Sequence, residues 1–179
     1  MEFEFREMSQ EEAEEIAFGW HYDGVYAFYD VEADEEDLAE FLDPAERDGT
    51  VFAGHSIHGL SGFFSISQVN NEAIEIGLGL RPDLTGQGIG AAFVEEGLSF
   101  AKKQFCFSRV TLSVASFNQR AIRLYKKMGF IRETTFLQKT NGGEYEFVKM
   151  QKKLQDFICS GKQELRGCFL DGDRKKEGR

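Results

Sequence analysis

The sequence predicts an α/β fold in which helices flank a mixed, mostly antiparallel β-sheet. Stretches that alternate apolar and polar residues, as half-buried strands do, occur in the first, middle and last thirds of the chain. An apolar strand that starts at Ile74 leads into a glycine-rich loop and then into a helical stripe of apolar residues. The 179 residues, of which 41% are hydrophobic, are enough for one sizeable core. We therefore expect one domain over residues 1–154 and a loosely ordered tail over residues 155–179.

The first quarter of the chain predicts one strand and two helices. Residues 1–7 alternate phenylalanine with charged residues, which indicates a strand with one buried face. Ser9 and Glu12 form a capping box at the start of the first helix. Asp34 is the expected N-cap of the second helix, and Pro44 lies just beyond the end of that helix.

The remaining elements are three antiparallel strands, a helix, a strand, a helix and a final hairpin. Pro82 ends the third of these strands because it has no amide hydrogen for the sheet, and Gly129 closes the last helix. The strands are expected at residues 50–57, 60–69, 74–80, 109–114, 131–138 and 144–150, and the helices from the glycine loop to about residue 104 and at residues 118–128.

Gly86, Gly88 and Gly90 open the helix that follows Pro82. Glycine allows sharp turns and close approach to a ligand, and the unpaired amides at a helix N-terminus favour phosphate. A P-loop needs a lysine directly after its glycines, but the next lysine is Lys102. The spacing also differs from that of dinucleotide-binding loops. The loop therefore favours another diphosphate ligand, and the alternative is a helix that merely has a glycine-rich entrance.

Two motifs resemble the signatures of the GNAT superfamily of acyl-CoA-dependent N-acyltransferases. Residues 85–90, Thr-Gly-Gln-Gly-Ile-Gly, are similar to the pattern Arg/Gln-x-x-Gly-x-Gly/Ala, from which only Thr85 departs. Residues 118–130 follow the second signature, Asn-x-x-Ala-x-x-Leu-Tyr-x-Lys-x-Gly-Phe. With the elements that carry them, the motifs cover residues 74–131. The sequence is identified on this basis as a member of the superfamily.

The resemblance implies a GNAT fold with four flanking helices, in which the strands before and after the glycine-loop helix run parallel and splay into a V. Acetyl-CoA would bind in this V as cosubstrate, with its pantetheine along an exposed strand edge. No metal is expected. The residues implied to contact the cofactor are Leu78, Gly79 and Leu80 for the pantetheine, Thr85, Gly86, Gln87, Gly88, Ile89 and Gly90 for the pyrophosphate, and Asn118 for cofactor placement or as a helix N-cap.

The implied reaction is attack of a neutral amine on a thioester, so it needs a proton acceptor and an acid for the departing thiolate. By resemblance, Tyr125 is that acid; the alternative is an interior helix tyrosine. Glu75 lies about where some members have a general base; the alternative is a strand carboxylate that faces solvent on the opposite side of the sheet. Ser113 replaces an acidic residue of some protein N-terminus acetyltransferases, which argues against their mechanism here.

The segment 20–29 has five aromatic residues in ten positions, and in GNAT folds this region forms one wall of the acceptor pocket. About half of these rings are expected to pack in the core. The resemblance makes Tyr22, Tyr26 and Tyr29 the candidates to line the substrate site.

Acidic residues are concentrated near the N-terminus. The first 48 residues contain eighteen acidic and two basic residues, and the whole chain has a net charge of −10. This distribution argues against nucleic acid as a partner. It is consistent with attraction of a cationic amine, but the simpler interpretation, two acidic helices solvated by water, is favoured.

The favoured function is an N-acetyltransferase that transfers an acetyl group from acetyl-CoA to a primary amine of a small molecule or protein. The alternative is a catalytically silent GNAT-fold module that binds acyl-CoA as a sensor or scaffold. The sequence shows no signal-peptide pattern and no apolar run of membrane-spanning length, so we expect a cytoplasmic protein without a membrane partner. Homodimers are common in the superfamily, and dimerisation stays open. Cys106, Cys159 and Cys168 are expected to be reduced thiols.

Overall fold

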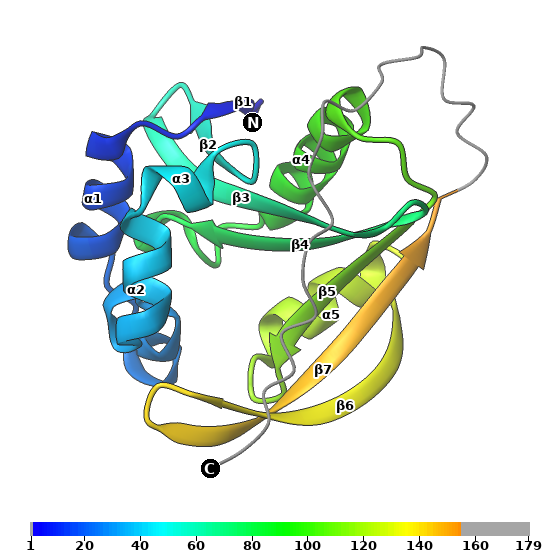
Figure 1. Cartoon of the computed structure of the whole chain (residues 1–179). Helices are drawn as coiled ribbons and strands as arrows, with labels where there is room; N and C mark the ends of the chain where they lie inside the picture. Colours follow the sequence, from blue (N-terminus) through cyan, green and yellow to red (C-terminus); the bar gives the residue numbers. More distant parts are fainter. Residues whose placement is uncertain (1, 155–179) are drawn as a thin grey trace.

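The computed structural model describes residues 2–154, which form one mixed seven-stranded sheet with helices against both of its faces (Figure 1). The strand order is β1-β2-β3-β4-β5-β7-β6. All neighbouring strands are antiparallel except β4 and β5, which are parallel. The strands are β1 Glu4–Glu7, β2 Val51–Ser56, β3 Gly59–Asn70, β4 Ala73–Leu80, β5 Arg109–Ala115, β6 Ile131–Thr140 and β7 Gly143–Lys153.

The predicted α/β class and the predicted succession of strands along the chain are confirmed. The α-helices are α1 Gln10–Gly19, α2 Glu35–Leu42, α3 Pro44–Arg47, α4 Gly90–Gln104 and α5 Gln119–Lys127, and three 3₁₀ helices are η1 Gly24–Tyr29, η2 Val31–Ala33 and η3 Pro82–Leu84. The predicted tail, residues 155–179, lies outside the described residues.

The capping signals act as predicted, and one helix was missed. The Ser9 side chain accepts from the Glu12 amide while the Glu12 carboxylate accepts from the Ser9 amide. Asp34 caps α2 by accepting from two backbone amides. The missed helix is the single turn α3, which starts at Pro44, where the absent amide hydrogen costs nothing. The described residues therefore contain five α-helices, one more than the four expected.

The main core lies between the sheet and helices α4 and α5. It is rich in phenylalanine, and Phe64 and Phe93 are completely buried. A Cβ atom at Gly97 of α4 would lie 2.5 Å from the Phe64 ring, so the helix packs at a distance that only glycine permits. This close packing holds α4, and the glycine loop that precedes it, against the sheet.

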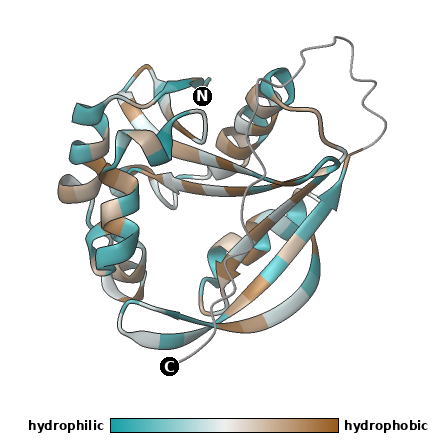
Figure 2. Cartoon of the chain, viewed as in Figure 1, coloured by the Kyte–Doolittle hydropathy of each residue, from teal (hydrophilic) through white to brown (hydrophobic). Residues whose placement is uncertain are grey.

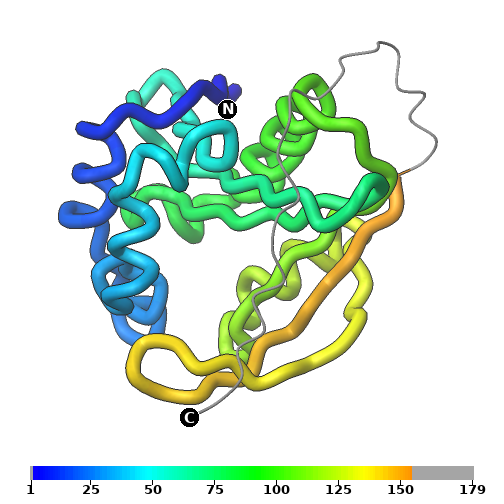
Figure 3. The backbone as a smooth tube through the Cα atoms, viewed as in Figure 1, coloured from blue at the N-terminus to red at the C-terminus, as the bar shows by residue number. Residues whose placement is uncertain are grey.

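The opposite face of the sheet is partly covered by α1 and α2, which are largely hydrophilic on their outer sides (Figure 2). The tip of the β6–β7 hairpin reaches across to the segment between these helices (Figure 3). There the Asn141 amide donates to Asp34 at 2.7 Å, and the Asn141 side chain donates to the Phe28 carbonyl at 2.7 Å. The acidic N-terminal segment is thereby tied to the far end of the sheet.

Two expectations from composition can be compared with the structure. Within residues 2–154, no helix is long and apolar enough to cross a membrane. Cys106 takes part in a disulfide, so the expectation of a reduced thiol is wrong for this residue. Cys159 and Cys168 lie outside the described residues.

Candidate active site

The parallel strands β4 and β5 separate part of the way along their length. They pair only at Ala73, Ile74 and Glu75 of β4 and then diverge, as Figure 1 shows. β4 continues to pair with β3 as far as Leu80, and β5 continues to pair with β7 as far as Ala115. In the described chain, the facing edges of β4 and β5 beyond Glu75 have no strand partner. The predicted V-shaped splay is present, and its edges offer backbone groups to an extended ligand.

The V contains a cavity of about 380 Å³. Its walls come from η1, β4, the glycine loop, β5 and α5, so the predicted cofactor and substrate residues meet at one place. Three of them, Glu75, Gln87 and Ile89, are not part of its lining. The predicted residues that line it are Tyr22, Tyr26, Tyr29, Leu78, Gly79, Leu80, Thr85, Gly86, Gly88, Gly90, Asn118 and Tyr125.

The glycine loop presents its backbone to this cavity, because Gly86, Gly88 and Gly90 line it. Gly86 and Gly88 have φ values of 77° and 81°, a conformation that favours glycine. The loop ends at Ile89, the N-cap residue of α4, which caps no amide with its side chain, and the first turn of α4 has no acidic residue. The N-terminal amides of α4 and the positive end of its dipole are therefore suited to an anionic group.

The polar side chains of the loop stabilise the loop itself. The Thr85 hydroxyl donates to the Pro82 carbonyl at 2.8 Å. Gln87 donates to the Asp83 carbonyl at 2.6 Å, and Ile89 packs against the core. Thr85, which departs from the family pattern, thus uses its hydroxyl within the turn, so any contact with phosphate falls to the backbone.

Arg120 is a cavity residue that sequence reasoning missed. Its guanidinium lies 4.6 Å from the ring centroid of Tyr26, and its Nη1 would be 3.7 Å from a Cβ atom at Gly86. Arg120 therefore places a positive charge beside the glycine loop. A signal for it was present, because Arg120 lies in the first turn of α5, where the helix dipole disfavours a cation.

The three tyrosines proposed for the substrate site line the V, but in different ways. The Tyr22 hydroxyl donates to the Leu80 carbonyl at 2.8 Å, and burial raises the pKa of Tyr22. The Tyr29 hydroxyl accepts from the Ala115 amide at 3.3 Å, and burial likewise raises its pKa. Tyr26 lies beneath Arg120. Tyr22, just before η1, thus contacts β4, and Tyr29, at the end of η1, contacts β5.

Tyr125 lies on α5 and is only 8% exposed, with its ring against Phe130. Burial raises the pKa of its phenol, and the nearby Tyr29 adds to this effect. Asn118 accepts from the Ala121 amide and so caps α5. The helix N-cap was one of the two roles predicted for Asn118. This cap stabilises the first turn of α5, the helix that carries Tyr125.

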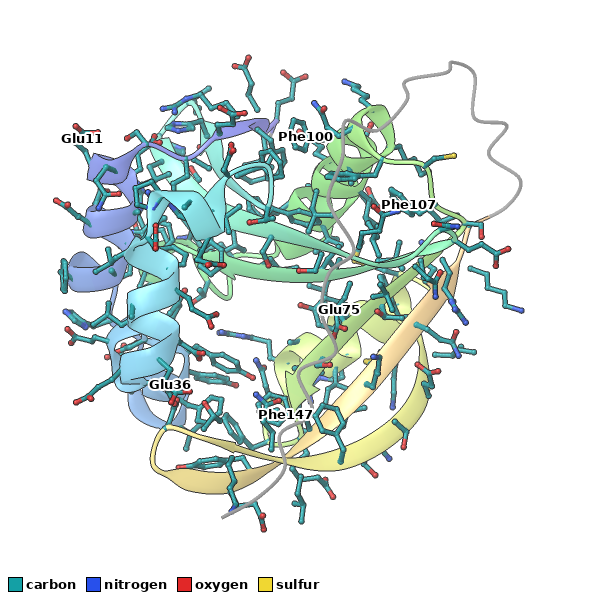
Figure 4. The ribbon with its side chains drawn as sticks, viewed as in Figure 1. Glu11, Glu36, Glu75, Phe100, Phe107 and Phe147 are labelled. Atoms are coloured by element: carbon teal, nitrogen blue, oxygen red, sulfur yellow. The ribbon has the colours of Figure 1, made fainter. Side chains whose placement is uncertain are left out.

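Glu75 lies on the face of the sheet opposite helices α4 and α5. Figure 4 shows it in the region between β4 and β5. Its neighbours Ile74 and Ile76 belong to the core under α4 and α5, so Glu75 points away from those helices. The Ser113 hydroxyl donates to Glu75 Oε1 at 2.9 Å, and Lys149 Nζ lies 3.5 Å from Glu75 Oε2. The surroundings of Glu75 are therefore polar, unlike the apolar residues that flank it in sequence.

A second cavity, of about 580 Å³, lies on this same face, which we call the open face. It shares Tyr29 and Phe63 with the cavity in the V. Four carboxylates line it, from Asp30, Asp37, Glu40 and Glu46, together with one buried cation, Arg47. Arg47 donates to the Phe41 carbonyl and to Gln10, both at 2.6 Å, and so joins α1, α2 and α3.

The electrostatics of the second cavity are those of crowded carboxylates. Burial raises the pKa of Asp37, and the neighbouring carboxylates of Asp34, Glu40 and Glu36 raise it further. A cation in this cavity would relieve the repulsion. Among residues 2–154 there is no group of three or more side chains suited to hold a metal ion.

Comparison with known proteins agrees with this geometry. A parallel pair that splays over a glycine loop and a tyrosine-bearing helix defines the GNAT class of folds, and residues 4–130 match the model of the acetyltransferase (GNAT) family. The chain belongs to this family.

The particular relatives are N-acetyltransferases. The chain is 31% identical over 94 residues to the thialysine N-ε-acetyltransferase of Bos taurus. This match covers 51% of the chain and 52% of the relative, so the chain spans about half the length of that protein.

Solved structures show the same fold at low sequence identity. A GNAT-family acetyltransferase from Bacillus anthracis superposes with a TM-score of 0.68 and 18% identity, covering 86% of this chain and 95% of that one. The spermidine N-acetyltransferase of Vibrio cholerae, solved with CoA and spermine, gives a TM-score of 0.67 and 17% identity, covering 85% and 95%.

Proposed function

We propose that this protein is an acetyl-CoA-dependent N-acetyltransferase whose acceptor is a cationic primary amine. The observation that supports this most strongly is the position of Tyr125 beside a V whose strand edges are unpaired. Binding of acyl-CoA alone would need the strand edge and the glycine loop. A phenol that faces the same cavity from α5 adds an acid at the place where the thioester would lie.

The residues that line the V fit acetyl-CoA. Over the part of the chain that the structure describes, β4 has no strand partner on the side of the V from Leu78 to Leu80, and this edge suits the pantetheine amides, with the Leu80 carbonyl already accepting from Tyr22. The amides near Gly88 suit the pyrophosphate. Nothing lies within 4 Å of a Cβ atom built on Gly88, so this backbone is open to a ligand. Arg120 supplies a positive charge beside Gly86 of the loop.

The proposed chemistry depends on which residues donate and accept protons during acetyl transfer. Acetyl-CoA supplies the thioester carbonyl that the amine attacks. Tyr125 is buried, and its raised pKa keeps the phenol protonated at neutral pH. It therefore holds a proton that it can donate to the sulfur as negative charge develops there. Glu75 lies on the open face, where an incoming ammonium has to lose a proton before it can attack.

The cavity on the open face is the proposed site of the acceptor. Its carboxylates would attract an ammonium group, and Tyr29 and Phe63 connect it to the V. Relatives named as thialysine and spermidine N-acetyltransferases are consistent with a cationic acceptor. Neither relative defines the acceptor of this chain.

The competing proposal is a module that binds acyl-CoA without catalysis. The two functions are separated by calorimetric titration with acetyl-CoA, followed by an assay of thiol release against diamines, polyamines, lysine analogues and peptides. An acetyltransferase binds acetyl-CoA and releases coenzyme A only when an amine is added. Binding with no release against any amine would support the sensor or scaffold, and no binding would contradict both functions.

A further inference from the structure

Three polar side chains from three neighbouring strands meet beside the point where β4 and β5 separate. Glu75 lies on β4, Ser113 on β5 and Lys149 on β7, and Ser113 and Lys149 are directly paired across β5 and β7. Ser113 occupies one carboxylate oxygen of Glu75 at 2.9 Å, and Lys149 lies 3.5 Å from the other. The carboxylate is thus held from both sides.

Ser113 is the member of this group that lines the cavity in the V. Its neighbours in β5, Leu112 and Val114, belong to the core on the side of Tyr125. Ser113 therefore reaches the V from the open face, while Tyr125 reaches it from the helix face. A thioester in the V would have a hydroxyl bonded to a carboxylate on one side and a phenol on the other.

We propose that Ser113 relays a proton from the acceptor amine to Glu75, and that Lys149 is a positioning residue that holds the Glu75 carboxylate. This inference rests on the proposed acetyltransferase function. It gives Ser113 a catalytic role at a position where related enzymes with a different mechanism have an acid.

The proton balance is complete without a further reactant. The acceptor arrives as an ammonium ion and has to lose two protons to become an amide. One passes to the Ser113 hydroxyl as that hydroxyl gives its own proton to Glu75, which leaves a neutral amine. The C–N bond then forms and the C–S bond breaks. Tyr125 donates its proton to the sulfur, and the second amine proton restores Tyr125.

The exposure of Glu75 to solvent allows the proton that it receives to leave the site. The Glu75 side chain is 34% exposed, so the proton that it receives can pass to solvent. The amine itself need not touch Glu75, which is not part of the cavity lining. Ser113 bridges this gap, and that is why a relay is required in place of direct transfer to the carboxylate.

The test is the pH dependence of kcat/KM in Ser113→Ala, measured by amine-dependent thiol release. A primary amine with a pKa near 10 is almost entirely protonated at pH 7, so loss of the relay should lower kcat/KM by about 10²-fold there. Without the relay the rate depends on amine that is already neutral. The deficit should therefore shrink by up to about tenfold for each pH unit between 7 and 9.

Matched variants separate the relay from structural damage. Ser113→Thr keeps a hydroxyl and should retain most of the activity. Ser108→Ala removes a serine hydroxyl at the entrance to β5, outside both cavities, and should behave as wild type. Lys149→Met should lower kcat/KM with a smaller pH-dependent deficit than Ser113→Ala, and Lys149→Arg should restore the rate.

Each outcome decides a different point. An active wild type whose Ser113→Ala variant has an unchanged rate, or a loss that is the same at every pH, would overturn the relay alone. A wild type that releases no thiol with any amine would overturn the proposed acetyltransferase and the relay with it.

Discussion

At the scale of single residues, Tyr125 combines burial with a position facing the V. Burial raises the pKa of its phenol because the charged form loses solvation. Tyr22, which donates to the Leu80 carbonyl, is affected in the same way. These shifts have one consequence for catalysis and another for stability.

Tyr125→Phe tests the catalytic consequence. The variant keeps the ring and most of its packing but loses the hydroxyl that would donate to the departing thiolate. Single-turnover acetyl transfer should fall by about 10²- to 10⁴-fold, while the calorimetric affinity for acetyl-CoA stays the same. A variant with the wild-type single-turnover rate would leave Tyr125 as a packing residue.

The stability consequence appears at alkaline pH. Above about pH 10 the unfolded state loses tyrosine protons that the folded state retains, so the free energy of unfolding falls as the pH rises. The slope is about 1.4 kcal/mol per pH unit for each buried tyrosine. Urea unfolding between pH 9 and 11 measures it. Tyr125→Phe should reduce the slope, and equal slopes in variant and wild type would contradict the burial of this phenol.

At the scale of elements, the glycine loop and helix α2 are the proposed sites of cofactor binding and acceptor binding, respectively. The loop conformation is set by backbone dihedral angles that side chains disfavour. Helix α2 carries carboxylates that line the open-face cavity and others that do not. Both elements therefore offer matched variants, one inside the site and one outside.

Gly88→Ala has a matched control in Gly59→Ala. The two glycines have φ values of 81° and 80°, and neither has an atom within 4 Å of an added Cβ. Both variants should lose about 1–2 kcal/mol of stability from the strained backbone. Only Gly88→Ala should weaken acetyl-CoA binding, by about tenfold or more, because its Cβ occupies the approach to the amides. Equal affinities by calorimetry would contradict the assignment of the phosphate loop.

Glu40→Gln and Glu36→Gln remove the same charge from α2. Glu40 lines the open-face cavity and Glu36 does not. For a cationic acceptor, Glu40→Gln should raise KM about fivefold or more, whereas Glu36→Gln should change it less than twofold, because exposed charges at longer range are screened. Equal changes in KM would assign the acidic residues of α2 to solubility.

At the scale of the whole molecule, the succession of strands along the chain and the capping sites could be predicted because their signals are local. Alternation, the Ser9–Glu12 box and the glycines each involve residues within a few positions of one another. Helix α3 was missed because a single turn has no periodicity to detect. The V was expected only through the family resemblance, since the divergence of two strands depends on pairing across the sheet.

The residues of the candidate site likewise fall into those that local sequence patterns predict and those that they do not. Four residues of the loop and four signature residues of the second motif, Asn118, Ala121, Leu124 and Tyr125, line the cavity, because the family pattern locates them. The group of Glu75, Ser113 and Lys149 joins residues up to 74 positions apart, which no sequence periodicity connects. Arg120 had a local signal, a cation in the first turn of a helix, that was not used.

The most direct test of the proposed chemistry is a single-turnover reaction with acetyl-labelled acetyl-CoA bound to excess protein. After addition of an accepted cationic amine, the label should appear on the amine in one exponential phase, with one equivalent of coenzyme A released and no labelled protein. Bound acetyl-CoA that stays intact with every cationic amine tested would contradict the proposed function.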